Sequence, residues 1–590
     1  MYLTRPPNYD KTPCVDVPGH GCAVGWDKLA MVLRDALSTK NGTVLAVDCY
    51  PGTDEAGIAG ELTRRLLPSR VVLTSEALRP PADIERLIEP FLGGNDPVFG
   101  FMCPLELEQF FDPEKLAGLR DQVRRRTDDG IIMVVGVGAT LAVRHPDVLV
   151  LADLARWEAQ LRFRRNASAN LGSKDPTVPA SLQYKRAFFV DWRVADRHKK
   201  PLLASCDFVL DTHLAVKPKL ATGVAVREGL KRASSRPFRV VPFFDPAPWG
   251  GQWMKEVCGL DPAPANYGWC FDCVPEENSL YLGLGEVRNF ELPSLDVVFQ
   301  HPRELLGDRV QARFGAEFPI RFDFLDTMAG GNLSLQVHPL TDYIQKTFGM
   351  QYTQDESYYM LDAGPEAGVY LGVKTGINPA EMIAALERAQ VDPAQPFPAS
   401  RFVNWWPAKK HDHFLIPAGT VHCSGSNAMV LEISATPYIF TFKLWDWGRL
   451  GLDGKPRPIH INHGRQVIQF DRDTEWTKRE LVNHIEPVGS GDGWTEERTG
   501  LHEREFIETR RHWFTKTVPH HTGGDVNVLN LIEGEEAVVE SPAGTFDPFV
   551  AHYAETFIVP ASVGAYTVRP TGRAIGTPCG TLKAFVRHGA

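Results

Sequence analysis

The sequence has little cysteine, and the cysteine that it has is scattered. Only 10 of its 590 residues are cysteine, which fits a reducing compartment where thiols stay free. Cys270 and Cys273 form the one close pair, and no second pair is present to complete the four thiolates of a structural zinc site. We therefore expect neither a disulfide framework nor a cysteine-bound zinc.

Long apolar runs and an excess of positive charge are also missing. The most apolar run, 130–143, is bounded by Asp129 and Arg144 and is shorter than the roughly 20 residues that span a bilayer. The opening residues MYLTRPPNYDK lack the apolar core of a secretion signal. The formal net charge of -10 argues against a general nucleic-acid binder. We expect a cytoplasmic protein that binds neither nucleic acid nor membrane, with homo-oligomer formation left open.

The pattern of apolar and polar residues differs between two parts of the chain. Between about 25 and 235, apolar β-like runs alternate with helix-like stretches, which is typical of βαβ units and a mainly parallel sheet. Beyond about 236, short β-like runs are separated by Pro, Gly and Asn, as in a sandwich or closed barrel. The expected strands of the first part are 44–48, 70–75, 131–138, 148–153, 186–191 and 206–211.

The predicted fold class is multidomain α/β plus all-β, with an N-terminal P-loop-like parallel α/β sheet followed by two cupin (jelly-roll) β barrels. The runs FLIPAGTVHC and FIVPASVGAY share one outline, and two barrels of one type would explain it. The expected domains are an α/β domain over 1–235, a catalytic barrel with a metal site and a short helical insert over 236–487, and a second, metal-free β barrel over 488–590.

A glycine-framed loop near the N-terminus lacks the residues that bind nucleotides. Gly52 and Gly57 lie between a β-like run and a helix-like stretch, but Ile58 and Ala59 stand where Lys and Ser or Thr should follow. Asp54 and Glu55 add negative charge where phosphates would lie. The region resembles P-loop kinases of the uridine kinase type with the catalytic loop dismantled, and we predict a structural or regulatory role. The resemblance further suggests Asp191 at a strand end as a former magnesium carboxylate, and a lid carrying Arg162, Arg164 and Arg165.

The middle of the chain carries a set of metal-ligand residue types. In a β strand Gln336 and His338 of LSLQVHP point to the same side. Glu356 follows in QDESYYML, and His422 follows a Pro-Ala-Gly turn. Two imidazoles, a carboxylate and an amide oxygen suit zinc or another borderline divalent ion with open positions. Taken alone, a histidine in a strand is more often a hydrogen-bonded core or rim residue.

The order of these motifs identifies a resemblance. Residues of about 238–480 resemble the type I mannose-6-phosphate isomerases, which are zinc-dependent enzymes of the cupin fold. The motifs that carry it are PFFDPAPWGG, LSLQVHP, the glutamate of QDESYYM, FLIPAGTVHCSG, VLEIS and LWDWGRLGLDGKPRPIHI. The resemblance implies one Zn²⁺ per chain on Gln336, His338, Glu356 and His422, a sugar phosphate as substrate, and reversible conversion of mannose 6-phosphate to fructose 6-phosphate through an enediol.

The resemblance also implies a catalytic group, with one departure. Glu432 of VLEIS matches an acidic residue of the pocket, but Lys443 stands where the family has an arginine. Because an ammonium lacks the fixed fork of a guanidinium, we expect Arg449 and Arg457 to supply that grip. Glu432, Lys443 and Arg449 are therefore the candidate catalytic residues, and Arg457, Lys374 and His411 the candidate substrate-binding residues. The candidate bases are Glu432, Lys443 and His411, in that order.

Two other functions stay open. The chain could be a non-catalytic sugar-phosphate sensor, which the Lys443 departure and the altered glycine loop favour. It could also be an isomerase or epimerase of another sugar phosphate, or an oxygen-using cupin, in which case the bound metal would discriminate, with iron pointing to oxygen chemistry.

Overall fold

The computed structural model describes residues 6–38, 44–125, 130–392, 394–435 and 440–587. Contacts divide them into two compact units, neither of which is continuous in sequence. The α/β unit comprises Cys14–Ala233 and Glu276–His301; the β unit comprises the residues up to Pro13, Ser234–Pro275 and those from Pro302 onward. The segment 276–301, expected in the catalytic barrel, thus groups with the α/β unit. The expected boundary at 487 lies inside the β unit and stays a prediction.

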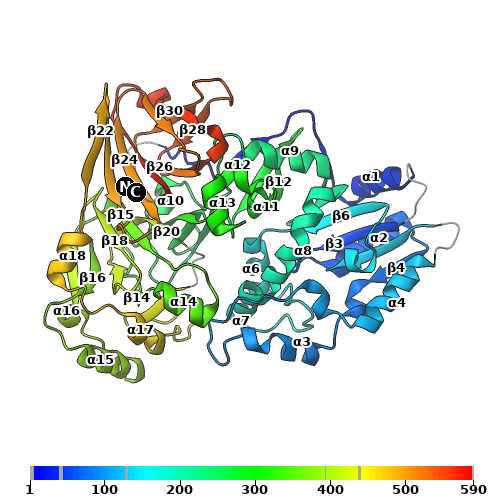
Figure 1. The fold of residues 1–590 in the computed structure, drawn as a ribbon, viewed down its shortest axis with the longest axis horizontal. Coiled ribbons are helices and arrows are strands. Elements are labelled where there is room, and N and C mark those ends of the chain that lie inside the picture. The colour runs from blue at the N-terminus through cyan, green and yellow to red at the C-terminus, as the bar shows by residue number, and fades with distance from the viewer. Residues whose placement is uncertain (1–5, 39–43, 126–129, 393, 436–439, 588–590) are drawn as a thin grey trace. The chain divides into compact units, whose positions relative to one another are not determined.

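A seven-stranded sheet forms the centre of the α/β unit (Figure 1). Its order is β2-β8-β7-β6-β3-β5-β4; the pairs from β7 to β4 are parallel, whereas β7–β8 and β8–β2 are antiparallel. Strands β3, β5 and β6 are buried along their whole length, which is why they appear in the sequence as unbroken apolar runs. The strands are β2 (Cys22–Val24), β3 (Val44–Cys49), β4 (Arg70–Leu73), β5 (Ile132–Gly136), β6 (Val148–Asp153), β7 (Phe208–Asp211) and β8 (Lys219–Thr222).

Five of the six expected strands are confirmed as β3 to β7, and the sixth is wrong. The run 186–191 is helical: Ala187–Asp191 forms a π-helical turn (η4) between helices α7 and α8. Phe188, Phe189 and Val190 are all fully buried, and a short run that is apolar on every side fits a buried helix as well as a buried strand. Asp191 consequently caps no strand; it accepts a hydrogen bond from Asn170 and lies 3.3 Å from the Arg186 guanidinium.

Helices and a small second sheet complete the α/β unit. The second sheet has the order β1-β11-β12, in which β1 (Cys14–Asp16) pairs in parallel with β11 (Ser279–Leu284), which pairs antiparallel with β12 (Val287–Pro293). The helices are α1 (Trp26–Ser38), α2 (Glu55–Leu66), α3 (Pro81–Ile88), α4 (Pro113–Arg124), α5 (Ala139–Ala142), α6 (Arg156–Arg164), α7 (Ala180–Arg186), α8 (Trp192–Ser205), α9 (Gly223–Ala233) and α11 (Leu295–Gln300), with short 3-10 turns at η1 (Thr74–Ala77), η2 (Glu89–Phe91) and η3 (Leu107–Phe110).

A buried ion cluster ties the inserted segment 276–301 to this sheet. The ammonium of Lys199 on α8 lies 2.5 Å from Asp153 at the end of β6 and 2.6 Å from Asp296 on α11. All three side chains are almost wholly buried. Burial and the neighbouring carboxylate Asp153 raise the pKa of Asp296, against the opposing effect of Lys199. The single cation therefore neutralises carboxylates that otherwise repel each other in an interior of low dielectric constant.

Two sheets build the first part of the β unit, which we call the first sandwich. One has the order β18-β15-β20-β13-β10-β9 and the other β17-β16-β19-β14-β21. The strands are β9 (Phe243–Asp245), β10 (Trp269–Cys273), β13 (Ile320–Asp326), β14 (Leu335–Val337), β15 (Glu356–Ala363), β16 (Gly368–Val373), β17 (Val403–Pro407), β18 (His413–Ile416), β19 (His422–Ser424), β20 (Ala428–Ala435) and β21 (Phe442–Trp445).

Two further sheets form what we call the C-terminal sandwich. Their orders are β22-β23-β24-β31-β26-β29 and β25-β30-β27-β28, and one buried apolar cluster draws residues from both. The two similar sequence runs occupy similar places, because FLIPAG leaves β18 into a turn before β19 and FIVPAS leaves β29 into a turn before β30. The strands are β22 (Glu486–Gly491), β23 (Trp494–Gly500), β24 (Ile507–Phe514), β25 (Val518–His521), β26 (Asn527–Glu533), β27 (Glu536–Glu540), β28 (Phe549–His552), β29 (Thr556–Val559), β30 (Ala565–Pro570) and β31 (Cys579–Val586).

The helices of the β unit are short. Within the described ranges, no helix of the chain combines the length and the apolar character needed to cross a bilayer. The helices of this unit are α10 (Trp253–Val257), α12 (Pro302–Leu306), α13 (Asp308–Phe314), α14 (Thr341–Phe348), α15 (Pro379–Val391), α16 (Ala399–Phe402), α17 (Ile461–Val467) and α18 (Thr474–Glu480), and α15 is the helical insert expected from the sequence.

Replacing Lys199 with Met should destabilise the α/β unit by about 3–5 kcal/mol, because it leaves Asp153 and Asp296 buried without their cation. The neighbouring Lys200→Met variant, whose ammonium lies over the Phe299 ring, is the matched control and should cost less than about 1 kcal/mol. Urea unfolding followed by tryptophan fluorescence measures both. Equal unfolding midpoints for the two variants would contradict the assigned role of the cluster.

Candidate metal centre and its surroundings

Three of the four predicted metal ligands meet in the first sandwich. One ligand atom from each of His338, Glu356 and His422 lies within 4.8 Å of the others, and all three side chains are fully buried. The Glu356 carboxylate spans the two imidazoles, with Oε2 3.1 Å from Nε2 of His338 and Oε1 2.9 Å from Nε2 of His422. Strand register explains the meeting, because β14 pairs with β19 and the two facing sheets present these side chains inward.

Gln336, the fourth predicted ligand, lies at the same place. It is the register partner of His422 across β14 and β19, and its amide group lies 3.1 Å from Nε2 of that histidine. His338 follows two residues later and shares the face, as the alternation predicts. The structure therefore brings all four predicted ligands together.

Backbone carbonyls fix the orientation of both imidazoles. Nδ1 of His338 lies 2.9 Å from the carbonyl oxygen of Phe440, and Nδ1 of His422 lies 2.8 Å from that of Thr420. Because a carbonyl oxygen only accepts, each Nδ1 carries the proton and each Nε2 presents a lone pair to the centre. Nε2 of His338 and Oε1 of Glu356 are buried and have no hydrogen-bond donor among the described residues. Lone pairs that face one another in a buried site fit a bound divalent cation.

The carboxylate is held in its charged form. Burial by itself would raise the pKa of Glu356, but positive charge at the position of His338 and His422 outweighs that effect and holds the pKa well below its usual range. With both imidazoles neutral, a bound cation would supply that charge. Gln354 donates a hydrogen bond of 2.9 Å to Oε2, and the buried ring of Tyr358 lies 5.8 Å from that of His422. Gln354 and Tyr358 were not predicted, although their positions two residues before and two residues after Glu356 place all three on one face of a strand.

Glu432 lies inside the same sandwich but is not free. Its carboxylate accepts hydrogen bonds from Arg321 at 2.6 Å and from the Ser434 hydroxyl at 2.9 Å. Burial, then Asp323 and Glu356, raise the pKa of Glu432 well above its usual range, with Arg321 opposing. Arg321 and Asp323 were not predicted, because they come from β13, about a hundred residues before β20, and no local motif marks them.

The predicted cations gather at one side of the metal cluster. Lys443 on β21 is the register partner of Gln336, and burial and the nearby Arg457 lower its pKa to about 8. Arg449 and Arg457 both bind the buried carboxylate of Asp446, at 2.6 and 2.8 Å. We call Lys443, Arg449 and Arg457 the basic edge, in which one described carboxylate, Asp446, stands against three cations.

Two predicted site residues lie elsewhere. His411 hydrogen-bonds the Tyr359 hydroxyl at 3.0 Å and lies 3.2 Å from Glu533 of the C-terminal sandwich. Since Tyr359 alternates with Glu356 and Tyr358 along β15, its side chain points away from the metal cluster. His411 is therefore wrong as a base for that site. Lys374 is exposed beyond the end of β16, and the structure gives it no contact with the ligands.

The glycine loop of the α/β unit is closed by its own side chains. Oδ1 of Asp54 accepts a hydrogen bond from the Gly57 amide, and Arg162, expected in a lid, donates to the Gly52 carbonyl. Burial raises the pKa of Glu55 to about 7. The bond from Gly57 occupies a backbone N–H of the kind that a phosphate-binding loop leaves for its ligand. A pocket of about 440 Å³ lies beside this loop and is lined by residues that include Asp54, Arg64, Arg65 and Arg162. These arginines already form ion pairs, Arg64 and Arg65 with Glu61 and Arg162 with Glu158.

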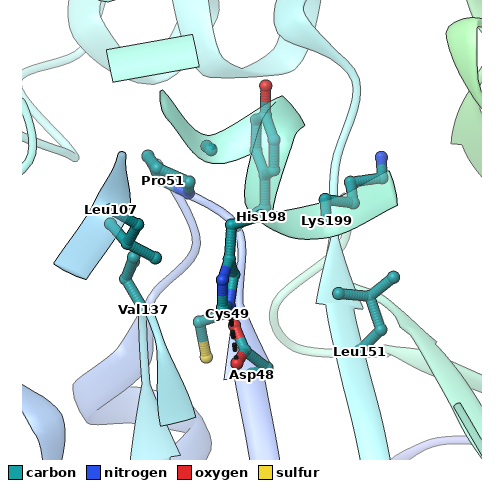
Figure 2. Close-up of a pocket in the computed structure, with 10 residues that line it drawn as sticks. Asp48, Cys49, Pro51, Leu107, Val137, Leu151, His198 and Lys199 are labelled. Atoms are coloured by element: carbon teal, nitrogen blue, oxygen red, sulfur yellow. Dashed lines mark hydrogen bonds and ion pairs between the residues drawn. The ribbon is translucent and has the colours of Figure 1, made fainter. Parts of the chain in front are cut away.

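The crevice at the carboxyl ends of β3, β5 and β6 is filled. Figure 2 shows apolar side chains around it and His198 directed at Asp48, with 3.0 Å between Nε2 and Oδ2. The remaining cavity measures about 10 Å³, which is room for one water molecule. Asp48 also accepts hydrogen bonds from the amide and hydroxyl of Thr140. A nucleotide does not fit this crevice as the structure has it.

Comparison with known proteins divides the chain as the composition does. Residues 25–235 match the family model described as a domain of unknown function, DUF8485. Mannose-6-phosphate isomerase ManA of Bacillus subtilis is 26% identical over 253 residues, 42% of this chain and 73% of that protein. Mannose-6-phosphate isomerase of Streptococcus mutans is 26% identical over 230 residues, 38% of this chain and 65% of that protein.

Two solved structures are similar to part of the chain at lower identity. The mannose 6-phosphate isomerase of Bacillus subtilis superposes with a TM-score of 0.48 at 17% identity, covering 60% of this chain and 100% of its own. A variant of phosphomannose isomerase from Salmonella typhimurium gives 0.44 at 15% identity with the same coverage.

We predict that His338→Ala and His422→Ala each abolish stoichiometric zinc binding, because each removes a lone pair from the centre. Gln354→Leu, which only frees the carboxylate, should weaken zinc by about 10–100-fold. His413→Gln is the control: His413 is equally buried but bonds Ser357 on the other face of the sheet, so this variant should keep its zinc. Metal analysis after dialysis measures all four, and retained zinc in both alanine variants would refute the ligand assignment.

We also predict that the protein does not bind ATP with magnesium, because the glycine loop bonds itself and the crevice beyond it is filled. Isothermal titration of the full chain tests this. Micromolar, magnesium-dependent binding would contradict the prediction.

Proposed function

We propose that this chain is a metal-dependent aldose-ketose isomerase that interconverts mannose 6-phosphate and fructose 6-phosphate, with zinc as its metal. The observation that carries the proposal is the buried Glu356 set between two imidazoles whose lone pairs face it. The relatives named mannose-6-phosphate isomerase support the same reaction class.

The basic edge supports an anionic substrate. Lys443 adjoins the ligand Gln336 in register, so the cations begin beside the metal cluster and continue away from it through Arg457 and Arg449. Asp446 balances one of the three charges. A sugar phosphate whose sugar end reaches the metal would find the remaining positive charge at its phosphate end, which is the arrangement that a phosphorylated hexose requires.

The reaction needs an electrophile and a base. A divalent cation held by Gln336, His338, Glu356 and His422 would supply Lewis-acid polarisation of the sugar oxygens. The base takes the proton from C2 of the open-chain aldose and returns a proton to C1. With His411 on the other face, Glu432 and Lys443 are the two remaining candidates.

We assign the proton transfer to Lys443. Its pKa of about 8, lowered by burial and by Arg457, leaves a useful fraction of neutral amine near pH 7. The described residues offer its ammonium no hydrogen bond, whereas Glu432 is engaged with both Arg321 and Ser434. Glu432 then acts within the buried network beside Tyr358, where it accepts a hydrogen bond from Arg321.

A sugar-phosphate sensor without turnover is the second candidate. The replacement of the family arginine by Lys443 and the closed glycine loop of the α/β unit favour it. The two functions differ in one measurable quantity, which is the steady-state rate with zinc bound.

The zinc-loaded protein should convert mannose 6-phosphate to fructose 6-phosphate in a coupled assay, and Arg457→Met should lower kcat/KM by about 10–100-fold, the equivalent of one charge-assisted hydrogen bond. Most of this loss should appear in KM, because the phosphate is held alike in the ground and transition states. Arg401→Met, which removes an exposed arginine paired with Glu381, is the matched control and should leave both constants unchanged. No turnover by wild-type protein with a full complement of zinc would rule out the isomerase and leave the sensor.

A further inference from the structure

The inner face of the C-terminal sandwich changes from apolar to polar along its strands. Side chains on one face of a strand are two residues apart, so the inward positions can be followed from the apolar cluster. That cluster includes Phe514 on β24, Val518 on β25 and Cys579 on β31, with Trp494 of β23 packed against it. Two residues from Phe514, Val518 and Trp494, the inward positions hold His512, His520 and Glu496, and four residues from Cys579 the same face holds Lys583.

These polar side chains are deeply buried. His512 is 2% exposed, His520 7% and Lys583 8%. Register places Glu496 opposite His512, and Lys583 opposite Arg510. The ring of His520 lies 4.4 Å from that of His512 and stacks on Tyr566 at 5.0 Å. One end of the sandwich interior therefore concentrates basic side chains from three strands of its two sheets.

Part of the hydrogen-bonding capacity of this group is not used by the described residues. Nδ1 of His512 and Nε2 of His520 are buried and have no hydrogen-bond partner among the described residues. Lys583 contacts the Phe585 ring at 5.6 Å, and the described part of the chain gives its ammonium no hydrogen bond. A buried polar group without a partner costs roughly 1–3 kcal/mol. Two such nitrogens beside the ammonium of Lys583 call for a ligand that satisfies them.

The surrounding charges favour an anion over a metal ion. Glu496 is already shared, 3.3 Å from His512 and 3.4 Å from Arg510, and Arg510 also pairs with Glu508. The ammonium of Lys583 would repel a dication. Burial lowers the pKa of Lys583 to about 8, with Glu496 opposing and Arg510 adding to the shift. Burial, then His512 and Lys583, lowers the pKa of His520 well below its usual range. An anion would reverse these shifts, because it favours the charged form of each base.

We propose that the polar end of the C-terminal sandwich binds a small oxyanion, a phosphate or carboxylate group, through His512, His520 and Lys583. This site is separate from the metal centre and does not depend on the isomerase proposal. Phosphate and carboxylate share the required chemistry, namely several acceptor oxygens around a negative charge. Glu496 and Arg510 border the site, and the Tyr566 ring supports His520.

The test reads the histidines themselves, so that phosphate bound at the metal centre cannot imitate the result. The full-length protein with isotope-labelled histidine is titrated with inorganic phosphate, or with acetate, at constant ionic strength with chloride as the reference anion. The ring signals of His512 and His520, assigned with His512→Gln and His520→Phe, should shift in a saturable way with the preferred anion. The arm that saturates at lower concentration identifies the group. Shifts no larger than those in chloride would overturn the proposal.

Lys583→Met adds a readout that a purely structural lysine would not give. Met fills a similar length without a buried charge, so the Tm without ligand should rise or stay unchanged, while the Tm increase and the His520 shift on adding phosphate should disappear. Lys516→Met, at an exposed lysine of the same sandwich paired with Asp492, is the matched control and should keep both responses. A lower Tm together with an unchanged phosphate response in Lys583→Met would refute the proposal. If this variant fails to fold, His520→Phe, which preserves the stack on Tyr566, gives the same comparison.

Discussion

The candidate metal centre depends on two backbone carbonyls. Those of Phe440 and Thr420 receive the Nδ1 protons of His338 and His422, and this leaves both Nε2 lone pairs aimed at one carboxylate. If either carbonyl moved, the imidazole could rotate and donate to Glu356, and the group would become an ordinary buried hydrogen-bonded cluster. The same three side chains would then hold no cation. The chemistry therefore depends on the main chain beside the ligands as much as on the ligands themselves.

Charge is distributed around this centre in two opposite ways. On the β13 and β20 side, Asp323 and Glu432 share Arg321, and burial together with this surplus of carboxylates raises their pKa values. On the β21 side, Asp446 holds Arg449 and Arg457 near Lys443, and burial together with the neighbouring Arg457 lowers the pKa of Lys443. A protein of net charge -10 thus carries a local positive edge. The overall charge gives no indication of this edge, because it arises from which strands are neighbours.

The features that the sequence could predict are those fixed by local periodicity. Gln336 and His338 share a face because a strand alternates, and β3, β5 and β6 appear as apolar runs because both of their faces are buried. Arg321 could not be found, since its partner Glu432 lies 111 residues away. His411 was misplaced because closeness in sequence to the ligand strands does not tell which face of the sheet a side chain takes. The strand predicted at 186–191 is wrong for a different reason. A short run that is buried on all sides has no hydrophobic periodicity that would distinguish a strand from a helix.

The two sandwiches use one architecture for different interiors. In the first, the inward positions around Glu356 carry acceptors, and a cation would neutralise their facing lone pairs. In the C-terminal sandwich, the corresponding polar end carries Lys583 beside His512 and His520, and the carboxylate Glu496 is already committed to His512 and Arg510. Lys583 would repel a cation there. An anion would instead accept hydrogen bonds from His512 and His520 and would favour the charged form of Lys583. The sign of the ligand therefore follows from whether donors or acceptors are left over inside each sandwich, which the shared strand order alone does not determine.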